Sequence, residues 1–199
     1  MKKVLFSKKL DDKNIQRRDY LLNKFKKYVN LDSCDLLDIG CGNGRFATLF
    51  GSKIKSYTGI EPDEEYLKIA KETTPKDAKA EYFKGRAEKI LLSKKFDVIF
   101  YGFSWHFIQD FDKAIKEAKR LLKKDGIIVI YEPSRETKKW ANSKLTRGSE
   151  DFDEEMYNLK LLDLEKGRMN ISKLSKHGFV IVEEEIDKGE SPNLWIAKL

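Results

Sequence analysis

Residues 36–46, with the sequence LLDIGCGNGRF, constrain the fold of this chain more than any other stretch. An apolar run ends at an aspartate, three glycines follow at alternate positions, and an apolar helical pattern then begins. This order predicts a buried strand, a tight turn and a helix start. Glycine lets a ligand approach bare main chain, and a helix start directs free N–H groups into the same space. The stretch therefore predicts a binding site for an electron-rich ligand, although a turn without a ligand is the structural alternative.

The spacing of the glycines argues against a nicotinamide dinucleotide. That fingerprint is G-x-G-x-x-G/A, and its third small residue lets the helix pack closely on the strand. Here the third position is Arg45, and the glycine comes one residue earlier, at Gly44. The pattern D-x-G-x-G-x-G instead resembles the first motif of the class I S-adenosylmethionine (SAM)-dependent methyltransferases. A NAD-dependent oxidoreductase is the disfavoured alternative.

Apolar strand patterns alternate with amphipathic helix patterns along the chain, which is typical of a parallel α/β sheet. Strands are expected at 35–39, 55–60, 80–84, 96–101, 127–131, 179–186 and 194–199, and helices at 8–30, 44–50, 63–71, 111–123 and 171–177. The short connection at 189–193 predicts a closing hairpin, which makes the last strand antiparallel. We therefore expect a doubly wound, Rossmann-like sheet of seven strands, mostly parallel, with helices on both faces. The methyltransferase resemblance covers roughly residues 14–199 and implies the same arrangement in one domain, 1–199.

Composition limits the number of domains, the cellular location and the ligands that we expect for this chain. A length of 199 residues suits a single domain, and no apolar run approaches the ~20 residues of a membrane span. The start has too short an apolar core for a secretory signal, so a cytoplasmic location is expected. Two cysteines and two histidines form no metal pattern, and no metal is expected. The net charge of +7 arises from 40 basic and 33 acidic residues, which favours a solvated, ion-paired surface over nucleic-acid binding.

A carboxylate follows the second predicted strand. Glu61 stands 17 positions after Gly44, and Pro62 and Asp63 then begin a helix. Ligands of doubly wound sheets bind at the carboxyl ends of the strands, where such a carboxylate can accept both hydroxyls of a ribose. The resemblance assigns Glu61 this role, with Pro62 beside it. The structural alternative is that Glu61 only complements the helix N-terminus.

The resemblance implies further contacts to SAM and its product S-adenosylhomocysteine (SAH). Asp38 and the backbone of Gly40, Cys41, Gly42, Asn43 and Gly44 would hold the amino-acid end. Adenine would lie against Arg86, Ala87 and Glu88, although Arg86 stands where the family often has an acid. Tyr101 ends the fourth predicted strand and Phe103 follows it, and both could offer aromatic faces to the sulfonium or the acceptor, since cations favour such faces.

Residues 102–110 leave the same edge of the sheet and resemble the "Ser-Leu-His-His-Ile-Pro-Asp" region of small-molecule methyltransferases. His106 matches the first histidine, and Phe107 replaces the second. A histidine at the mouth of a site can act as a general base, so His106 is the candidate catalytic residue. It could equally cap the following helix or shape the pocket. Residues 1–30 are expected to form a helical cover, and 135–170 an insertion that acts as a lid over the acceptor.

Several acceptor classes lack their motifs. The chain has no Pro-Cys pair for cytosine C5 methylation and no Pro-Pro-aromatic motif after the fourth strand for amino methylation of DNA bases. It also has no acidic cluster suited to a magnesium-dependent catechol site. A small-molecule acceptor is therefore expected. The alternatives are an RNA or protein acceptor, or a SAM- or nucleoside-binding module without catalysis. Nothing in the sequence indicates an oligomeric state.

Overall fold

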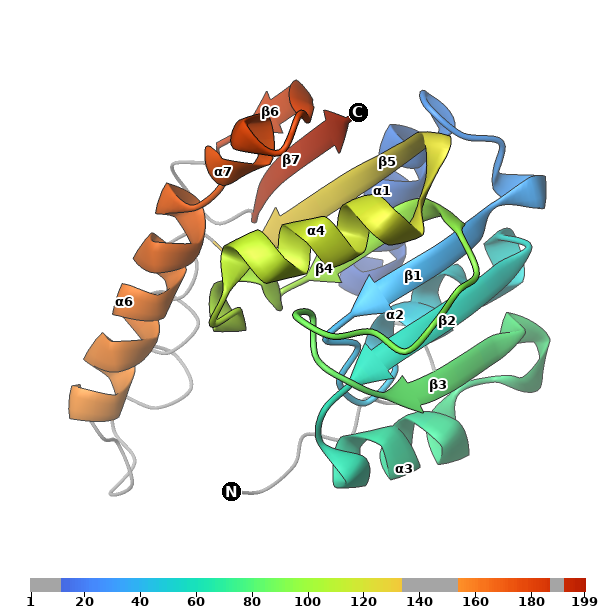
Figure 1. The fold of residues 1–199 in the computed structure, drawn as a ribbon. Helices are drawn as coiled ribbons and strands as arrows, with labels where there is room; N and C mark the ends of the chain where they lie inside the picture. Colours follow the sequence, from blue (N-terminus) through green and yellow to red (C-terminus); the bar gives the residue numbers. More distant parts are fainter. Residues whose placement is uncertain (1–11, 134–153, 187–191) are drawn as a thin grey trace.

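A seven-stranded sheet forms the centre of the molecule (Figure 1). The computed structural model describes residues 12–133, 154–186 and 192–199, and the side chains of 154–161 are not part of that description. The strand order is β3-β2-β1-β4-β5-β7-β6, and β7 alone pairs antiparallel to its neighbours. The strands are β1 Asp35–Ile39, β2 Ser56–Glu61, β3 Ala80–Lys84, β4 Phe96–Gly102, β5 Leu122–Glu132, β6 Val180–Glu185 and β7 Asn193–Lys198. This confirms the expected doubly wound sheet with a closing antiparallel strand.

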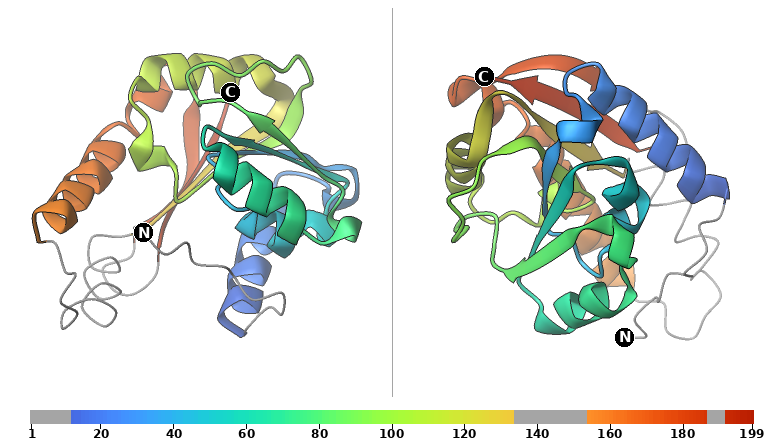
Figure 2. Two further views of the ribbon diagram at one scale, coloured as in Figure 1. Left: turned by 90° about the horizontal axis from the view of Figure 1, so that it is seen from below. Right: turned by 90° about the vertical axis from the view of Figure 1, so that its right-hand side faces the viewer.

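Helices cover both faces of the sheet. One face carries α1 (Asp12–Lys26), α2 (Arg45–Phe50) and α3 (Glu64–Thr73), and the other carries α4 (Phe111–Leu121) and α7 (Lys173–Lys176). Figure 2 shows α1 and α4 on opposite sides of the strands. Helix α6 (Glu154–Met169) packs against η4, a short 3-10 turn at Trp105–Phe107. Among the described residues, no helix is both long enough and apolar enough to cross a membrane.

The alternation of side chains along the central strands divides the core into two layers. In β1, Leu36 packs toward α1 and α2, whereas Leu37 packs toward α4. All five residues of β1 are buried, as expected for an inner strand of a parallel sheet. On the α2 side, Phe100 makes edge contacts with Phe46 and Phe50, with ring centroids 4.8 and 5.6 Å apart. Both layers pack against β1 and β4, and the predicted site lies at the carboxyl ends of these two strands.

The strand after α4 begins five residues earlier than the sequence predicts. We expected the helix to reach Lys123 and a turn at Asp125-Gly126, but α4 ends at Leu121 and β5 begins at Leu122. Leu122 pairs with Phe96, while Ile127 pairs with Val98, so residues 123–126 bulge out of the ladder. The residues expected to form a turn, Asp125 and Gly126, therefore form part of an irregularity within β5. Lys123 holds it in place by binding Asp97 and Asp35, at 2.8 and 3.2 Å.

The parallel strands end together at one edge of the sheet. The turns after β1, β2, β3 and β4 meet there, and the β5 end at Glu132 lies beside the β4 turn. The expected cover at 1–30 is seen as α1 over its described part, with residues 1–11 outside the described range. Of the expected lid at 135–170, the structure describes α6 and the residues that follow it, and 134–153 lie outside the described range.

Candidate functional site

The turn after β1 is built on left-handed glycines. Gly40, Gly42 and Gly44 have φ of 77°, 54° and 78°. The amides of Gly40 and Cys41 both donate to the carbonyl of Ile60, at 2.8 and 3.0 Å, so the turn is fixed to β2. A Cβ on Gly40 would lie 2.5 Å from Ser104 Cβ, whereas a Cβ on Gly42 would meet nothing within 4 Å. Gly40 thus allows close packing, while Gly42 borders open space.

Glu61 lies against this turn. Its two carboxylate oxygens accept hydrogen bonds from the amides of Gly42 at 3.0 Å and Asp63 at 3.1 Å. Asp63 in turn caps α3 by accepting from the amides of Glu65 and Tyr66. Burial raises the pKa of the Glu61 carboxyl, and the two amide hydrogen bonds oppose that rise. The carboxylate therefore joins the glycine turn to the start of α3, and its contact with ribose stays a prediction.

A cavity of about 410 Å³ opens between these elements. Nine of the predicted cofactor residues line it: Gly40, Gly42, Glu61, Pro62, Arg86, Ala87, Glu88, Tyr101 and Phe103. The sequence did not single out the remaining lining residues, which are Ile39, Tyr66, Gly85, Ser104, Phe107 and Ile108. Most of these flank a predicted residue directly. The structure thus brings the four strand-end motifs to one cavity at the carboxyl edge.

The other predicted contacts lie behind the cavity wall. Asp38 is fully buried, and one of its oxygens accepts from the Tyr57 hydroxyl while Oδ1 has no hydrogen-bond partner. Burial raises the pKa of Asp38 to about 7. Cys41 is buried with its sulfur against the backbone of β2, and Asn43 and Gly44 continue the turn beyond the lining.

The turn after β3 is tied to the turn after β4. Glu88 Oε1 accepts from the amide of Gln109 at 2.9 Å, and Arg86 lies 3.8 Å from the other Glu88 oxygen. The Gly85 amide donates to the carbonyl of Glu61 at 3.2 Å. Residues 85–88 therefore form one wall of the cavity that is anchored on both sides. In this arrangement Glu88 already binds the neighbouring loop, and the Arg86 carbonyl accepts from the Lys89 amide at 3.0 Å.

Two aromatic residues at the end of β4, Tyr101 within the strand and Phe103 just after it, differ in their surroundings. Phe103 has a left-handed φ of 61°, which is a strained conformation for a non-glycine residue. A hydrogen bond that its amide donates to the Tyr131 carbonyl, at 2.8 Å, holds this conformation. The guanidinium groups of Arg17 and Arg45 lie 5.6 and 5.8 Å from its ring. Tyr101 is fully buried in edge contact with a tryptophan, and its hydroxyl has no hydrogen-bond partner.

His106 forms a buried pair with Glu132. The carboxylate accepts from His106 Nδ1 and, through its other oxygen, from the Trp105 amide at 2.9 Å. His106 Nε2 is buried without a hydrogen-bond partner. Gly167 of α6 packs on this turn, since a Cβ there would lie 3.0 Å from His106 Cα, and its carbonyl accepts from the Trp105 indole. His106 is therefore beside the cavity, not in its lining.

Glu132 is the functional candidate that the sequence reading missed. It is 5% exposed and comes at the carboxyl end of β5, on the same edge as the predicted motifs. That position was visible in the sequence as an acid followed by Pro133. Its partner was not visible, because the two residues are 26 positions apart and meet only through sheet pairing.

The cavity fits a nucleoside that carries an amino acid. Open space lies beside Gly42, a carboxylate lies at the end of β2, and the unpartnered Tyr101 hydroxyl lies among the lining residues. The volume falls within the range of small-molecule sites. No group of three or more potential metal ligands occurs among the residues that the structure describes.

Comparisons with known proteins point to a methyltransferase domain. A family model described as "Methyltransferase domain" matches residues 37–130. The ubiquinone biosynthesis O-methyltransferase of Pelagibacter ubique is 29% identical over 168 residues, which cover 77% of this chain and 68% of that protein. The chain spans less than half the length of other curated relatives that it matches.

Solved structures share the fold. A SAM-dependent methyltransferase from Clostridium acetobutylicum is 18% identical with a TM-score of 0.66, over 96% of this chain and 92% of that chain. A SAM-bound amino pentose methyltransferase from Micromonospora echinaspora is 19% identical with a TM-score of 0.53, over 60% of this chain and 50% of that chain. Together, the matching domain, the relatives and the glycine turn support a class I SAM-dependent methyltransferase, the family whose methyl donor is SAM.

Proposed function

We propose that this chain transfers a methyl group from SAM to a small organic acceptor. The observation that carries the proposal is the cavity at the carboxyl edge, where the open backbone at Gly42 and the carboxylate of Glu61 face one space. The relatives support the small-molecule class, since their names describe methyltransferases of ubiquinone biosynthesis and of an amino pentose.

Each wall of the cavity has a separate task in this proposal. The backbone of residues 40–44 holds the amino-acid end, Glu61 accepts the two ribose hydroxyls, and the backbone of 86 and 87 contacts adenine. When bound, SAM supplies a methyl group that its sulfonium has already activated. The chain therefore works mainly by holding the acceptor in line, and such positioning can supply ~7–11 kcal/mol of a barrier.

His106 lies beside the cavity and is 3% exposed, so it would serve as general base only for an acceptor that reaches its Nε2. Because Nδ1 donates to Glu132, the neutral imidazole leaves Nε2 as its proton acceptor. Within the described part of the chain, Nε2 has no competing partner. Glu132 then orients the ring and stabilises the imidazolium that forms. A His106→Asn variant that keeps SAH affinity and transfer rate would refute this role.

The two covering elements define the acceptor side of the cavity. Arg17 of α1 lies on the Phe103 ring, and α6 packs on the turn that carries His106 and Phe107. Phe107 lines the cavity and is 61% exposed, so it offers an apolar surface at the mouth. We propose that α1 and the segment 135–170 together select the acceptor, as a cover and a lid.

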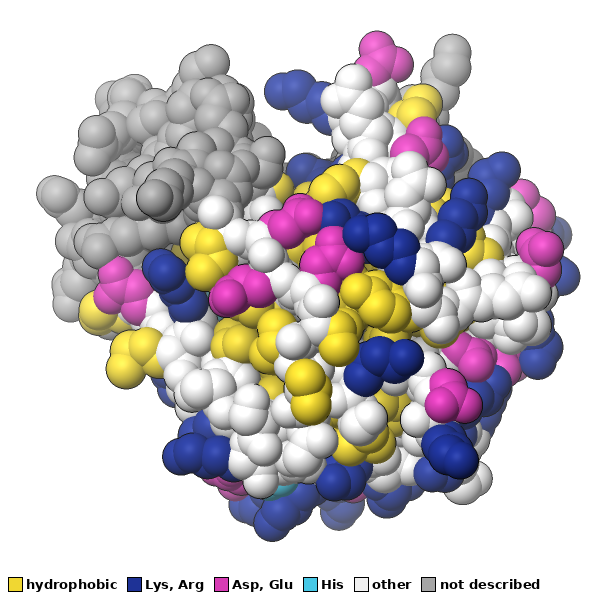
Figure 3. Space-filling model, turned by 90° about the horizontal axis from the view of Figure 1, so that it is seen from above, with side chains coloured by type: hydrophobic (Ala, Val, Ile, Leu, Met, Phe, Trp, Pro, Cys, Tyr) yellow, Lys and Arg dark blue, Asp and Glu magenta, His cyan; other side chains and the backbone are white. Residues whose placement is uncertain are grey.

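The charge distribution favours a small acceptor over RNA. Basic and acidic side chains lie next to one another across the face shown in Figure 3, with apolar side chains between them. A nucleic-acid substrate would call for a continuous basic field on the protein surface, and this face does not carry one. RNA as the acceptor would also require binding that weakens steeply with salt.

The function is tested in two steps. Calorimetry with SAM, SAH and NAD should detect binding of SAM and SAH and none of NAD. Incubation with radiolabelled SAM and fractionated cell extract should then transfer label to a low-molecular-weight fraction. Tight SAM binding with no transfer to any fraction would instead support the module without catalysis, and labelled RNA or protein would redirect the search for the acceptor.

A further inference from the structure

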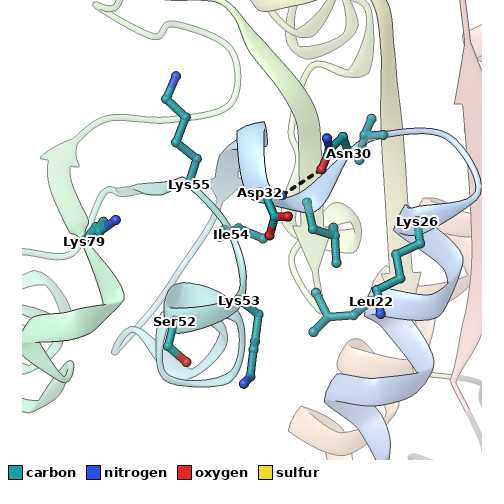
Figure 4. A pocket seen from close by; sticks show the side chains of 11 residues that line it. Leu22, Lys26, Asn30, Asp32, Ser52, Lys53, Ile54, Lys55 and Lys79 are labelled. Carbon is teal, nitrogen blue, oxygen red and sulfur yellow. Dashed lines mark hydrogen bonds between the residues drawn. The ribbon is translucent and has the colours of Figure 1, made fainter.

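A second hollow lies at the opposite edge of the sheet from the SAM cavity. It has a volume of about 780 Å³ and is bordered by the end of α1, by the 3-10 turns η1 (Leu31–Ser33) and η2 (Gly51–Lys53), and by the residues that precede β2 and β3 (Figure 4). These segments come before the strands, whereas the SAM cavity forms after them. The two sites share no lining residue.

Four lysines from four segments border this hollow: Lys26, Lys53, Lys55 and Lys79. In Figure 4, Lys26 and Lys53 extend along one side and Lys55 and Lys79 extend in other directions. Among the described residues, no ion pair engages Lys26, Lys53 or Lys79, and Lys55 reaches Asp35 at 3.3 Å. Asp32 is the single acid among the described lining residues. The border therefore carries an excess of about three positive charges.

This excess stands out against the neighbouring surface. Asp35, just beyond the hollow, takes ion pairs from Lys55, Lys94 and Lys123, all within 3.3 Å. Basic groups near the strand starts are thus matched where a carboxylate is available. Around the hollow, Lys26, Lys53 and Lys79 have no such partner among the described residues, which is an arrangement that a bound anion would stabilise.

The floor of the hollow is aliphatic. Leu22, Leu31 and Ile54 are each less than a tenth exposed, and Val29 adds to them. No aromatic ring occurs among the described lining residues, so the surface does not provide a stacking platform for a base. The frame is also rigid, because Gly51 and Ala78 pack so closely that a Cβ on Gly51 would lie 2.2 Å from Ala78 Cβ.

We propose that this hollow binds an amphiphilic phosphate: a small anion with two or more charges on an aliphatic body. The lysines would contact the charged head, and the aliphatic floor would take the apolar part. A hollow of this volume suits one small molecule. An extended nucleic-acid backbone would contact the lysines but not the aliphatic floor.

The test uses geranyl diphosphate as the probe. Geraniol represents its apolar part, and inorganic tripolyphosphate represents a charged head without an apolar part. Calorimetry on the full chain at low ionic strength should show binding of geranyl diphosphate, weaker binding of tripolyphosphate and none of geraniol. A triple variant, Lys26→Gln with Lys53→Gln and Lys79→Asn, should weaken geranyl diphosphate at least about tenfold. Asparagine is chosen at 79 because it tolerates the φ of 45° found there.

A matched control removes three charges elsewhere. Lys68, Lys71 and Lys116 are exposed on α3 and α4, away from the hollow, and their joint replacement by Gln should change the affinity less than about threefold. No binding of geranyl diphosphate at about 1 mM, equal weakening in both triple variants, or equal binding of geraniol would each overturn the proposal, as would binding of an RNA oligonucleotide alone. SAH affinity should stay unchanged in both variants, so this result is separate from the proposed methyl transfer.

Discussion

Removal of the Glu61 carboxylate should weaken the binding of SAH by about ten- to a hundredfold. The carboxylate is held by the amides of Gly42 and Asp63, at 3.0 and 3.1 Å, and borders the cavity. Two ribose hydroxyls donating to it would form charge-assisted bonds of roughly 1.5 kcal/mol each at least. Their combined loss of about 3 kcal/mol corresponds to about a hundredfold, and solvation of the released hydroxyls reduces the effect toward tenfold.

The assay is calorimetric titration of Glu61→Ala with SAH, which binds without reacting. Glu61→Gln should fall between the variant and the parent, because its amide keeps one acceptor oxygen but loses the charge. Glu64→Ala is the control: it lies three residues further on, is exposed, and pairs with Lys84 on the surface. Thermal unfolding checks that each variant is folded. If folded Glu61→Ala binds SAH within about threefold of the parent, the ribose assignment is wrong.

Four further substitutions test other parts of the site. Gly42→Ala should cost only about 1–2 kcal/mol of stability, because its Cβ meets open space, but it should weaken SAH binding at least about tenfold. Gly40→Ala should cost more stability, because its Cβ would lie 2.5 Å from Ser104 Cβ. Denaturant titration compares the two variants, and equal losses of stability would contradict this reasoning. Burial raises the pKa of Asp38 to about 7, so the folded chain binds this proton more tightly than the unfolded chain, and its stability should fall as pH rises from about 4 to about 7. Asp38→Asn should flatten that fall in the unfolding midpoint, and an unchanged pH profile would refute the assignment. Gly167→Ala should lower stability by about 1–3 kcal/mol, because its Cβ would lie 3.0 Å from His106 Cα, and an unchanged denaturation midpoint would show that α6 is not docked there.

The sequence predicted the features of the site that are encoded locally. The glycine spacing at 40–44 and the acid after the second strand are short patterns, and both lie where they were expected. The antiparallel β7 also followed from a short connection, since a few residues allow a hairpin but no crossover. The conformation of these elements is determined by residues that are close to them in the sequence.

Features that depend on distant partners were missed. The turn expected at 125–126 became a bulge, because Phe96 pairs with Leu122 across the sheet. The burial of His106 depends on Gly167, which lies 61 positions later and brings α6 against it. Periodicity within a window carries no information about such contacts, so a side chain predicted at the mouth of the site was found beneath a helix.

The contacts between α1 and β6 bear on the order in which this molecule can be completed. Lys24 binds Glu183 and Glu185, and Tyr20 donates to Glu185, so the first described helix is tied to the sixth strand. The seventh strand is synthesised after the other six and must insert between β5 and β6. Until it does, β5 keeps an unpaired edge and β6 has no neighbour in the sheet, so its acids are not positioned for the helix. The ion pairs that hold α1 over Phe103 therefore depend on β7, and deletion of residues 193–198 should leave α1 without its partner strand.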